Sequence, residues 1–302
     1  MSDSYNFFET PRDSIMTSMS MALMAVSSDN VCLASGSCII VAPLVALTAL
    51  HVIDDYSRRI DDEPLGSNKN ITFRLYLRGQ TPEGVGLIFE VAQIFSNPPT
   101  DIVALSLRPA CDAARSFTWR KPRLRLNPPA VGSRVACFGY REAAARAEIN
   151  GSNVTIEWSE VPTTARGVVR EVFFVRRDTS MVNFPAFHFD ARVDGGMSGG
   201  PVFSEDGRLV GLMSTSLPAG SDNEPHSSFA ALIYPGLTLD FRFPQPVPSE
   251  FPQAVRLYEL AQRRIIDVDD LDLFSMHVRE DASVLAMLRF PNSPNKIISP
   301  MP

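Results

Sequence analysis

Cysteine is scarce in this chain, which has only four among its 302 residues. Small secreted proteins without a large core depend on many disulfide bonds, so this count excludes a disulfide-rich scaffold. The cysteines form no Cys-x-x-Cys pair and no cluster with histidine, so we expect no metal site. They are interpreted as reduced thiols within strands, and they are Cys32, Cys38, Cys111 and Cys137.

Long apolar runs and a basic leader are also lacking. The apolar segment Ile15–Val26 is too short to span a bilayer, and the first six residues contain no Lys or Arg of the kind that opens a secretory signal. The net charge is −6, whereas nucleic acids and anionic membranes bind clustered Lys and Arg. We therefore expect a cytoplasmic protein with no nucleic-acid partner and no membrane partner.

Helix signals are few before residue 250. Short β-branched or alternating runs recur instead, separated by Gly, Pro, Asn or Asp, and they predict an all-β barrel or sandwich. The segment Arg108–Pro129 has few strand signals and is interpreted as a connector between two β units. The predicted strands are Ser35–Val41, Ile71–Leu77, Leu87–Phe95, Ile102–Leu107, Arg134–Tyr140, Asn153–Ser159, Gly167–Val175, Ala186–Phe189, Pro201–Phe203, Leu209–Ser214 and Ser228–Ile233.

The C-terminal part has a different pattern. Pro244–Pro248 predicts a short stiff spacer, and Ser249–Ile265 predicts one amphipathic helix with basic residues near its C-terminal end. An acidic run, Asp267–Asp272, follows. Two interpretations stay open: a helix docked on the β units with a trailing strap, or an extension that binds a regulatory protein partner.

A serine lies between glycines in Gly195-Gly-Met-Ser-Gly-Gly-Pro-Val-Phe203. Such a turn can expose the hydroxyl of Ser198, and the missing Cβ atoms let a carbonyl group approach the backbone N–H groups. A plain turn between strands has the same composition. A serine nucleophile therefore also needs a base and a carboxylate that orients the base.

Two other segments supply candidates for these roles. His51 follows the apolar run Val45–Leu50, and Asp101 opens the strand Ile102–Leu107. Taken singly, each residue is typical of a structural role at a strand end or in a turn. Their occurrence together with Ser198 favours nucleophilic catalysis.

The three segments resemble the chymotrypsin-like (trypsin-like) serine protease family, and most of all its bacterial and HtrA-type branch. They follow the family's order of His, Asp and Ser, with separations of 50 and 97 residues. The resemblance covers roughly residues 20–240 and includes the strand Ser35-Gly-Ser-Cys-Ile-Ile40 before the histidine. The matching segments are Thr48-Ala-Leu-His51, Thr100-Asp-Ile-Val-Ala-Leu105 and Gly196-Met-Ser-Gly-Gly-Pro201.

The resemblance implies an all-β fold of two antiparallel six-stranded β-barrels with a C-terminal helix and tail. Residues 1–15 would be a lead-in, and residues 16–115 the first barrel with His51 and Asp101. Residues 116–130 would connect it to the second barrel, residues 131–245, which carries Ser198. Residues 246–302 would form the C-terminal helix and extension.

The resemblance also implies roles for individual residues. Ser198 would be the nucleophile, His51 the general base and then acid, and Asp101 the group that orients His51. The backbone N–H groups of Gly196 and Ser198 would form the oxyanion hole. The reaction would need no cofactor and no metal.

Four residues are expected to bind the substrate. Met213, Ser214 and Thr215 would pair with the substrate peptide as an added β-strand. Arg192 lies six residues before Ser198, where trypsin-like relatives have a residue at the base of the specificity pocket. It suggests cleavage after Asp or Glu by charge pairing, whereas Met213 would instead provide an apolar pocket wall.

One departure from the family concerns activation. Met197 stands where secreted digestive relatives have an Asp that pairs with a freed N-terminal amine. We therefore do not expect N-terminal trimming to activate the protein. The favoured function is a serine endopeptidase acting on proteins or peptides, either active as it stands or latent until a partner releases it. The alternative is a catalytically silent peptide-binding or scaffold module of a larger complex.

Overall fold

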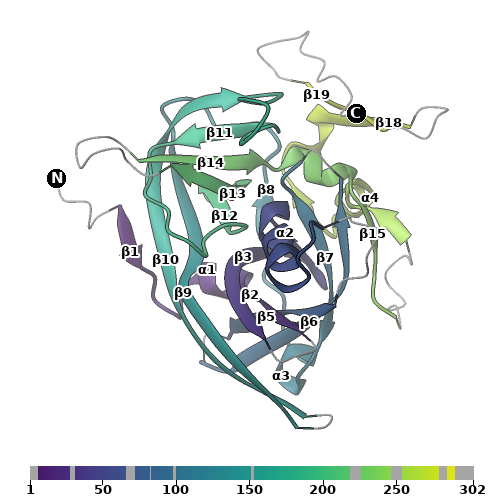
Figure 1. Cartoon of the computed structure of the whole chain (residues 1–302). Coiled ribbons are helices and arrows are strands. Elements are labelled where there is room, and N and C mark those ends of the chain that lie inside the picture. The colour runs from purple at the N-terminus through teal and green to yellow at the C-terminus, as the bar shows by residue number, and fades with distance from the viewer. Residues whose placement is uncertain are drawn as a thin grey trace.

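A computed structural model describes residues 6–27, 31–65, 72–81, 83–97, 100–150, 153–217, 226–245, 254–278 and 284–289. The described residues are mostly in strands, as the sequence predicts, and they form two large sheets with short helices around them (Figure 1).

The first sheet is a closed antiparallel barrel of six strands, which confirms the expected first barrel. Its interior is apolar because alternate side chains point inward, and Leu23, Ile40, Leu77, Phe89 and Leu105 are all fully buried there. In order around the barrel, the strands are β2 (Ser20–Ser27), β3 (Cys32–Ala42), β4 (Val45–Thr48), β7 (Val103–Pro109), β6 (Gly86–Ser96) and β5 (Phe73–Gln80).

The second sheet has nine strands and curls back on itself, because β12 pairs with both β9 and β13. Six of its strands are β9 (Arg134–Asn150), β10 (Asn153–Phe173), β11 (Ala186–Phe189), β12 (Pro201–Ser204), β13 (Leu209–Leu217) and β14 (Ser227–Leu232). The other three are β1 (Phe7–Glu9), β8 (Arg123–Leu124) and β17 (Asp267–Val268).

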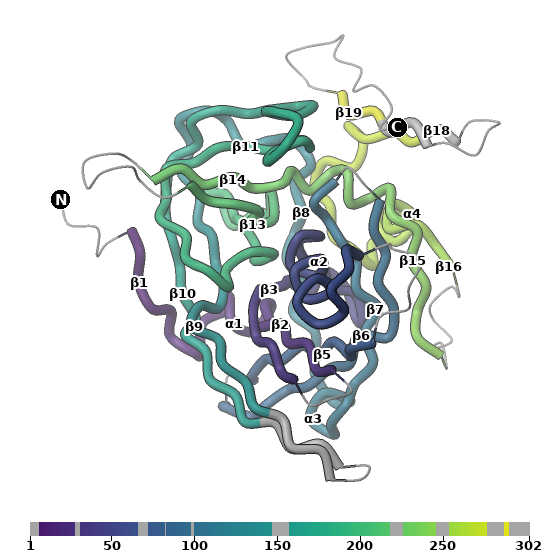
Figure 2. Tube along the Cα trace, in the orientation of Figure 1, coloured from purple at the N-terminus to yellow at the C-terminus, as the bar shows by residue number. Residues whose placement is uncertain are grey.

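This second sheet contains the six antiparallel strands expected of the second barrel, β9 to β14, and has further strands that were not expected. Segments from the expected lead-in, connector and C-terminal extension each add a short strand, and β8 pairs in parallel with both β13 and β17. In addition, β9 and β10 form one long hairpin in place of the shorter strands expected there. Figure 2 shows this hairpin running from the second sheet down alongside the first barrel.

The helix α2 (Leu50–Ile60) was not expected from the sequence. Its side chains Val52, Ile53 and Tyr56 are buried against the first barrel, while its exposed face carries acidic residues paired with arginines one turn later. The pattern of apolar residues four apart, with Arg58 and Arg59 in the last turn, is the signal that could have predicted it. The remaining helices are α1 (Ile15–Met19), α3 (Asp112–Arg115), α4 (Leu257–Gln262) and the 3₁₀ helices η2 (Tyr234–Thr238) and η3 (Leu271–Leu273).

The helix expected over Ser249–Ile265 is wrong in its extent. Within that range only α4 is helical. The segment before it, β16 (Ala254–Arg256), is a strand paired with β15 (Asp240–Arg242). The first residues of the expected helix, before β16, lie outside the described part of the chain. The pairing places Val255 opposite Phe241, and both side chains are buried, so tertiary contacts override the helical pattern.

The C-terminal segment packs on the rest of the molecule. Leu257, Leu260 and Ala261 belong to the same apolar core as the second sheet. Beyond them, β18 (Phe274–Val278) and β19 (Val284–Leu288) form a separate hairpin at the upper edge of the view in Figure 1. The described part of the C-terminal segment is therefore packed against the second sheet and is not a free tail.

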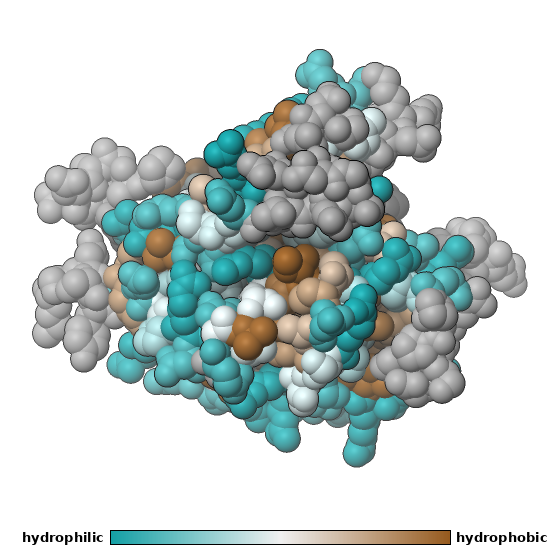
Figure 3. Space-filling model, turned by 90° about the horizontal axis from the view of Figure 1, so that it is seen from below, coloured by the Kyte–Doolittle hydropathy of each residue, from teal (hydrophilic) through white to brown (hydrophobic). Residues whose placement is uncertain are grey.

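The surface seen from below is mainly hydrophilic, with apolar residues gathered in a few small areas (Figure 3). Within the described ranges, no helix combines the length and the apolar character needed to cross a membrane.

Tyr56 ties α2 to the first barrel. It is fully buried, and its hydroxyl accepts the backbone N–H of Ser35 in β3 at 2.9 Å and donates to the carbonyl of Leu23 in β2 at 2.9 Å. Losing this hydroxyl leaves the buried Leu23 carbonyl and the partly buried Ser35 N–H without that partner.

We expect Tyr56→Phe to lower the free energy of unfolding by about 1–3 kcal/mol, because buried polar groups lose their hydrogen bonds. Urea denaturation followed by circular dichroism measures this change. Tyr258→Phe is the matched control. Tyr258 lies in α4 and its ring packs on Phe274, but its hydroxyl makes no hydrogen bond to another described residue. Equal losses in the two variants would contradict the role given to the Tyr56 hydroxyl.

Candidate active site

His51 and Asp101 are brought together by the pairing of β4 with β7. Thr48 at the end of β4 lies opposite Val103 at the start of β7, so the residues flanking these two strand ends become neighbours. The Nδ1 atom of His51 lies 2.8 Å from Oδ2 and 3.1 Å from Oδ1 of Asp101, and its backbone N–H donates to Oδ1 at 2.9 Å. The buried carboxylate therefore holds both the ring and the backbone of His51, with Nδ1–H as the donor.

The pKa of His51 is raised above its ordinary value of 6.5. Burial of the ring is the largest effect and lowers the pKa, because it penalises the charged form. The hydrogen bond to Asp101 and the negative charges of Asp101, Asp55 and Asp54 together outweigh it. The charged, protonated form of the His51 ring is thus more stable in this site than it is in water.

Ser214, in β13 of the second sheet, contacts both Asp101 and Ser198. Its hydroxyl donates to Oδ2 of Asp101, and its backbone carbonyl accepts the hydroxyl of Ser198 at 3.1 Å. Sequence reasoning placed Ser214 only on the substrate-binding strand and missed this second contact. No local signal marks it, because Ser214 and Asp101 are 113 residues apart.

Ser198 lies in the glycine-rich turn that leads into β12. Among the described residues its hydroxyl makes no hydrogen bond to His51, although both residues are linked through Ser214 and Asp101. The structure therefore brings His51, Asp101 and Ser198 to one place, with the serine hydroxyl donating to a backbone carbonyl.

The turn before Ser198 has a conformation that requires glycine. Gly196 has φ of +92°, and the N–H of Met197 donates to the carbonyl of Asp194 at 3.3 Å, which is the geometry of a type II turn. A Cβ atom at Gly196 would also lie 2.5 Å from the carbonyl oxygen of Tyr140. In the described structure the backbone N–H groups of Gly196 and Ser198 donate to no other backbone group.

The expected substrate strand borders a hollow of about 590 Å³. β13 pairs with β12 only as far as Leu212, so no described strand covers that edge of Ser214 and Thr215. Both residues line the hollow, whereas Met213 is buried in the core and does not. Other lining residues are Leu50, His51, Met181 and Phe184.

Arg192 does not line this hollow. Its guanidinium bonds the carboxylate of Asp194 at 2.9 and 3.1 Å, and it lies over the ring of Phe7 in β1, 4.6 Å from the ring centre. Half of its side chain is exposed. The contact with β1 could not be predicted from sequence, because β1 joins the second sheet only in the folded chain.

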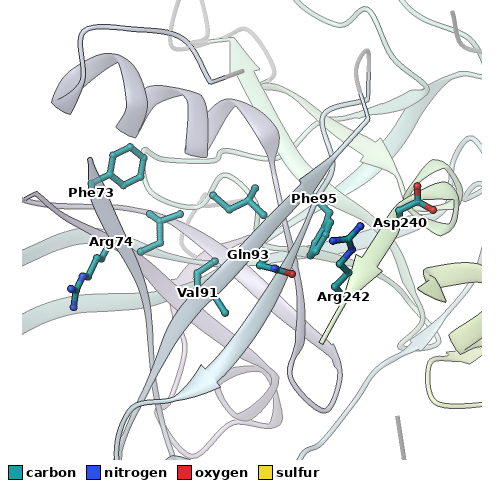
Figure 4. Close-up of a pocket in the computed structure, with 10 residues that line it drawn as sticks. Phe73, Arg74, Val91, Gln93, Phe95, Asp240 and Arg242 are labelled. Atoms are coloured by element: carbon teal, nitrogen blue, oxygen red, sulfur yellow. The ribbon is translucent and has the colours of Figure 1, made fainter. Parts of the chain in front are cut away.

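A second hollow, of about 610 Å³, opens where β5 and β6 separate next to β15 (Figure 4). Its polar side chains include Arg74, Gln93, Asp240 and Arg242, and it is lined by no serine, cysteine or histidine. Within the described residues, no three His, Cys, Asp or Glu side chains are grouped to hold a metal ion. Of the three candidates, His51 and Asp101 line the first hollow. Ser198 does not line it, but its hydroxyl bonds the carbonyl of Ser214, which does.

Comparison with known proteins gives a family match. Residues 36–212, more than half of the chain, match the trypsin-like peptidase domain, and this range contains His51, Asp101 and Ser198. No curated protein matches the chain in sequence.

Several solved structures are similar to this chain. The crystal structure of Deg5 has 17% sequence identity to this chain and a TM-score of 0.47, and the match covers 72% of this chain and 85% of the Deg5 chain. The active form of the Rv3671c protease from M. tuberculosis is 15% identical, covers 79% and 87%, and has a TM-score of 0.49. The HtrA-type protease AlgW with tripeptide is 17% identical, covers 74% and 58%, and has a TM-score of 0.44. On the family match and the His, Asp and Ser segments within it, this chain belongs to the trypsin-like serine peptidases.

Proposed function

We propose that this peptidase is an endopeptidase that cleaves proteins or peptides through an acyl-enzyme on Ser198. The observation that carries the proposal is the hold of one buried carboxylate, Asp101, on both the ring and the backbone of His51. This contact leaves Nε2 of His51 as the free acceptor, which is the state that a general base needs.

The chemistry follows from these positions. Oγ of Ser198 attacks the substrate carbonyl while His51 takes its proton, and the N–H groups of Gly196 and Ser198 stabilise the oxyanion. His51 then protonates the leaving amine, and a water molecule activated by His51 hydrolyses the ester. Asp101 stabilises the imidazolium in both steps, in line with the raised pKa of His51. No cofactor takes part in this scheme.

The substrate peptide would lie as an added strand along β13. The edge of Ser214 and Thr215 that faces the hollow supports this arrangement, because main-chain groups there can pair with an extended peptide. The apolar side chains Met181 and Phe184, which also line the hollow, would contact the substrate side chains.

For the cleaved position we propose an uncharged residue that contacts Met181 and Phe184; Met213 is left out of this wall because its side chain is buried in the core. The ion pair with Asp194 neutralises Arg192 locally, and this compensation supports the apolar alternative over pairing with a substrate Asp or Glu.

One observation favours the latent form of the enzyme, or the silent binding module. The hydroxyl of Ser198 donates to Ser214 and, in the described residues, not to His51. Catalytic hydrogen bonds often form only when substrate binds, so we propose activation by substrate or by a regulatory partner on the C-terminal extension. The hairpin β18–β19 supports the partner proposal, since it pairs with neither main sheet.

We also propose a cytoplasmic location, with no nucleic-acid and no membrane partner. All four cysteines are free thiols, and buried Cys38 and Cys137 have raised pKa values because burial penalises the thiolate. This state suits a reducing compartment. The acidic net charge of −6 supports the absence of polyanionic partners.

Ser198→Ala should abolish both labelling by a fluorophosphonate probe and hydrolysis of a casein-type substrate, because the nucleophile is removed. Gel fluorescence and mass spectrometry of the labelled peptide measure this, with Ser133→Ala as the control for a partly exposed serine elsewhere. A folded wild-type protein that never labels, even with substrate present, would favour the silent binding module.

The pKa of His51 should lie above 6.5 in an NMR titration, and Asp101→Asn should lower it. The sign follows because the substitution removes the hydrogen bond and a negative charge that raise the pKa, and leaves burial, which lowers it. Asp55→Asn, the control, removes only a more distant charge and should lower the pKa less. Equal shifts in the two variants would show that Asp101 does not hold the ring.

A peptide library should show cleavage after uncharged residues, and Arg192→Gln should leave this preference essentially unchanged. The reason is that Arg192 is already paired with Asp194. Liquid chromatography with mass spectrometry identifies the cleaved bonds. A wild-type preference for Asp or Glu that disappears in Arg192→Gln would instead place Arg192 in the specificity pocket.

A further inference from the structure

Ser37, a buried residue of β3, lies directly beneath the turn that carries the two oxyanion N–H groups. It is fully buried, and it belongs to the first barrel, whereas the turn belongs to the second sheet. Its side-chain oxygen donates to the carbonyl of Gly196 at 2.8 Å and accepts the backbone N–H of Tyr140 at 2.8 Å. Its own backbone N–H donates to the carbonyl of Ser198 at 2.7 Å.

These bonds fix the carbonyl groups of Gly196 and Ser198, the two residues whose N–H groups would form the oxyanion hole. Gly196 and Ser198 each have the carbonyl bound by Ser37, while each N–H is free of backbone partners in the described structure. The carbonyl of Met197 between them accepts the N–H of Gly200 at 3.0 Å. The carbonyl groups of Gly196, Met197 and Ser198 are therefore all hydrogen-bonded within the protein, while the N–H groups of Gly196 and Ser198 remain available to a substrate oxygen.

The hydroxyl of Ser37 has only one orientation that satisfies its neighbours. Because its lone pair accepts the N–H of Tyr140, its proton is directed to Gly196. The space is also tight, since a Cβ atom on Gly139 would lie 3.0 Å from the Ser37 oxygen and 2.6 Å from Cα of Met197. Thr48 fixes Ser37 in turn by donating its hydroxyl to the Ser37 carbonyl at 2.7 Å.

We propose that Ser37 is a positioning residue for the oxyanion hole, whose hydroxyl holds the Gly196 peptide so that the turn keeps its type II form. This inference rests on the proposed function. The two glycines at the centre of the turn permit the alternative type I form, in which the peptide between Gly195 and Gly196 is rotated and the Gly196 N–H points elsewhere. The Gly196 carbonyl belongs to the adjoining peptide, Gly196–Met197, so the hydroxyl of Ser37 fixes the backbone on one side of Gly196 and thereby restricts rotation of the Gly195–Gly196 peptide on the other side.

The first test compares the rate of fluorophosphonate labelling at Ser198 in Ser37→Ala and Ser106→Ala. Ser106 is an equally buried serine of the first barrel whose hydroxyl has no partner among the described residues, so its variant should label like the wild type. Ser37→Ala should label on the order of 10²-fold more slowly, because one oxyanion donor is displaced. Ser37→Cys keeps a weak donor and should be intermediate.

A second readout separates positioning from general damage. The pH at which the labelling rate is half its plateau should be the same in Ser37→Ala and wild type, since the substitution leaves the contact of Asp101 with His51 intact. A fall in the plateau with an unchanged midpoint supports the proposal. A Ser37→Ala rate equal to that of Ser106→Ala, or a shifted midpoint with the same plateau, would overturn it.

Crystal structures of the wild type and of Ser37→Ala, or of Ser37→Gly, which also lacks the hydroxyl, if the alanine variant does not fold, test the inference without activity. The wild type should keep Gly196 near its φ of +92°, and the variant should show the rotated peptide. An unchanged Gly196 in the variant would overturn the role of Ser37. A wild type that does not label would count against the proposed function, and the two crystal structures would still decide the role of Ser37.

Discussion

The candidate active site depends on hydrogen bonds that cross between the first barrel and the second sheet. Asp101 and His51 belong to the barrel, Ser198 belongs to the curled sheet, and neither half holds a complete set of reacting groups. The hydroxyl of Ser214 reaches across to Asp101, and Ser37 reaches across in the opposite direction to the turn before Ser198. Because each crossing bond starts from a residue fixed in a strand, the two halves are tied at the site itself.

The same crossing bonds explain how a buried carboxylate is tolerated. Asp101 is nearly inaccessible to water, and burying an ionised group without partners is strongly unfavourable. Its two oxygens accept the ring and backbone N–H groups of His51 and the hydroxyl of Ser214. The bonds that stabilise the Asp101 carboxylate thus also orient His51, and the Ser214 that donates one of them accepts the hydroxyl of Ser198 through its backbone carbonyl.

The sequence was most informative where a function is carried by residues close together in the chain. The segments around His51, Asp101 and Ser198 could be recognised from a few neighbouring residues, and the alternating strands predicted an all-β fold with a first barrel that the structure confirms. The contacts among the three segments depend on strand pairing over long separations. For that reason the role of Ser214 toward Asp101 was not predicted.

Local patterns failed where tertiary pairing decides the conformation. Residues around Val255 have a helical apolar pattern, yet they form a strand because β15 offers an edge on which Val255 and Phe241 are both buried. The short strand β1 has no strand signal of its own and is ordered by pairing with β10. Conversely, α2 was overlooked because its first residues continue the apolar run of β4, and its helical periodicity begins only after His51.

Met197 shows how the turn can be stable without the ion pair that secreted relatives are expected to use. Its side chain is fully buried in the apolar core, and its Cα packs so closely on Gly139 that a larger residue there would be excluded. An apolar side chain at this place needs no charged partner and no free terminal amine. The conformation of the turn then depends on packing at Met197 and on the hydrogen bonds from Ser37, both of which form when the two halves meet. Order in this turn is in this way coupled to the assembly of the fold, because neither contribution exists until the barrel and the second sheet are in contact.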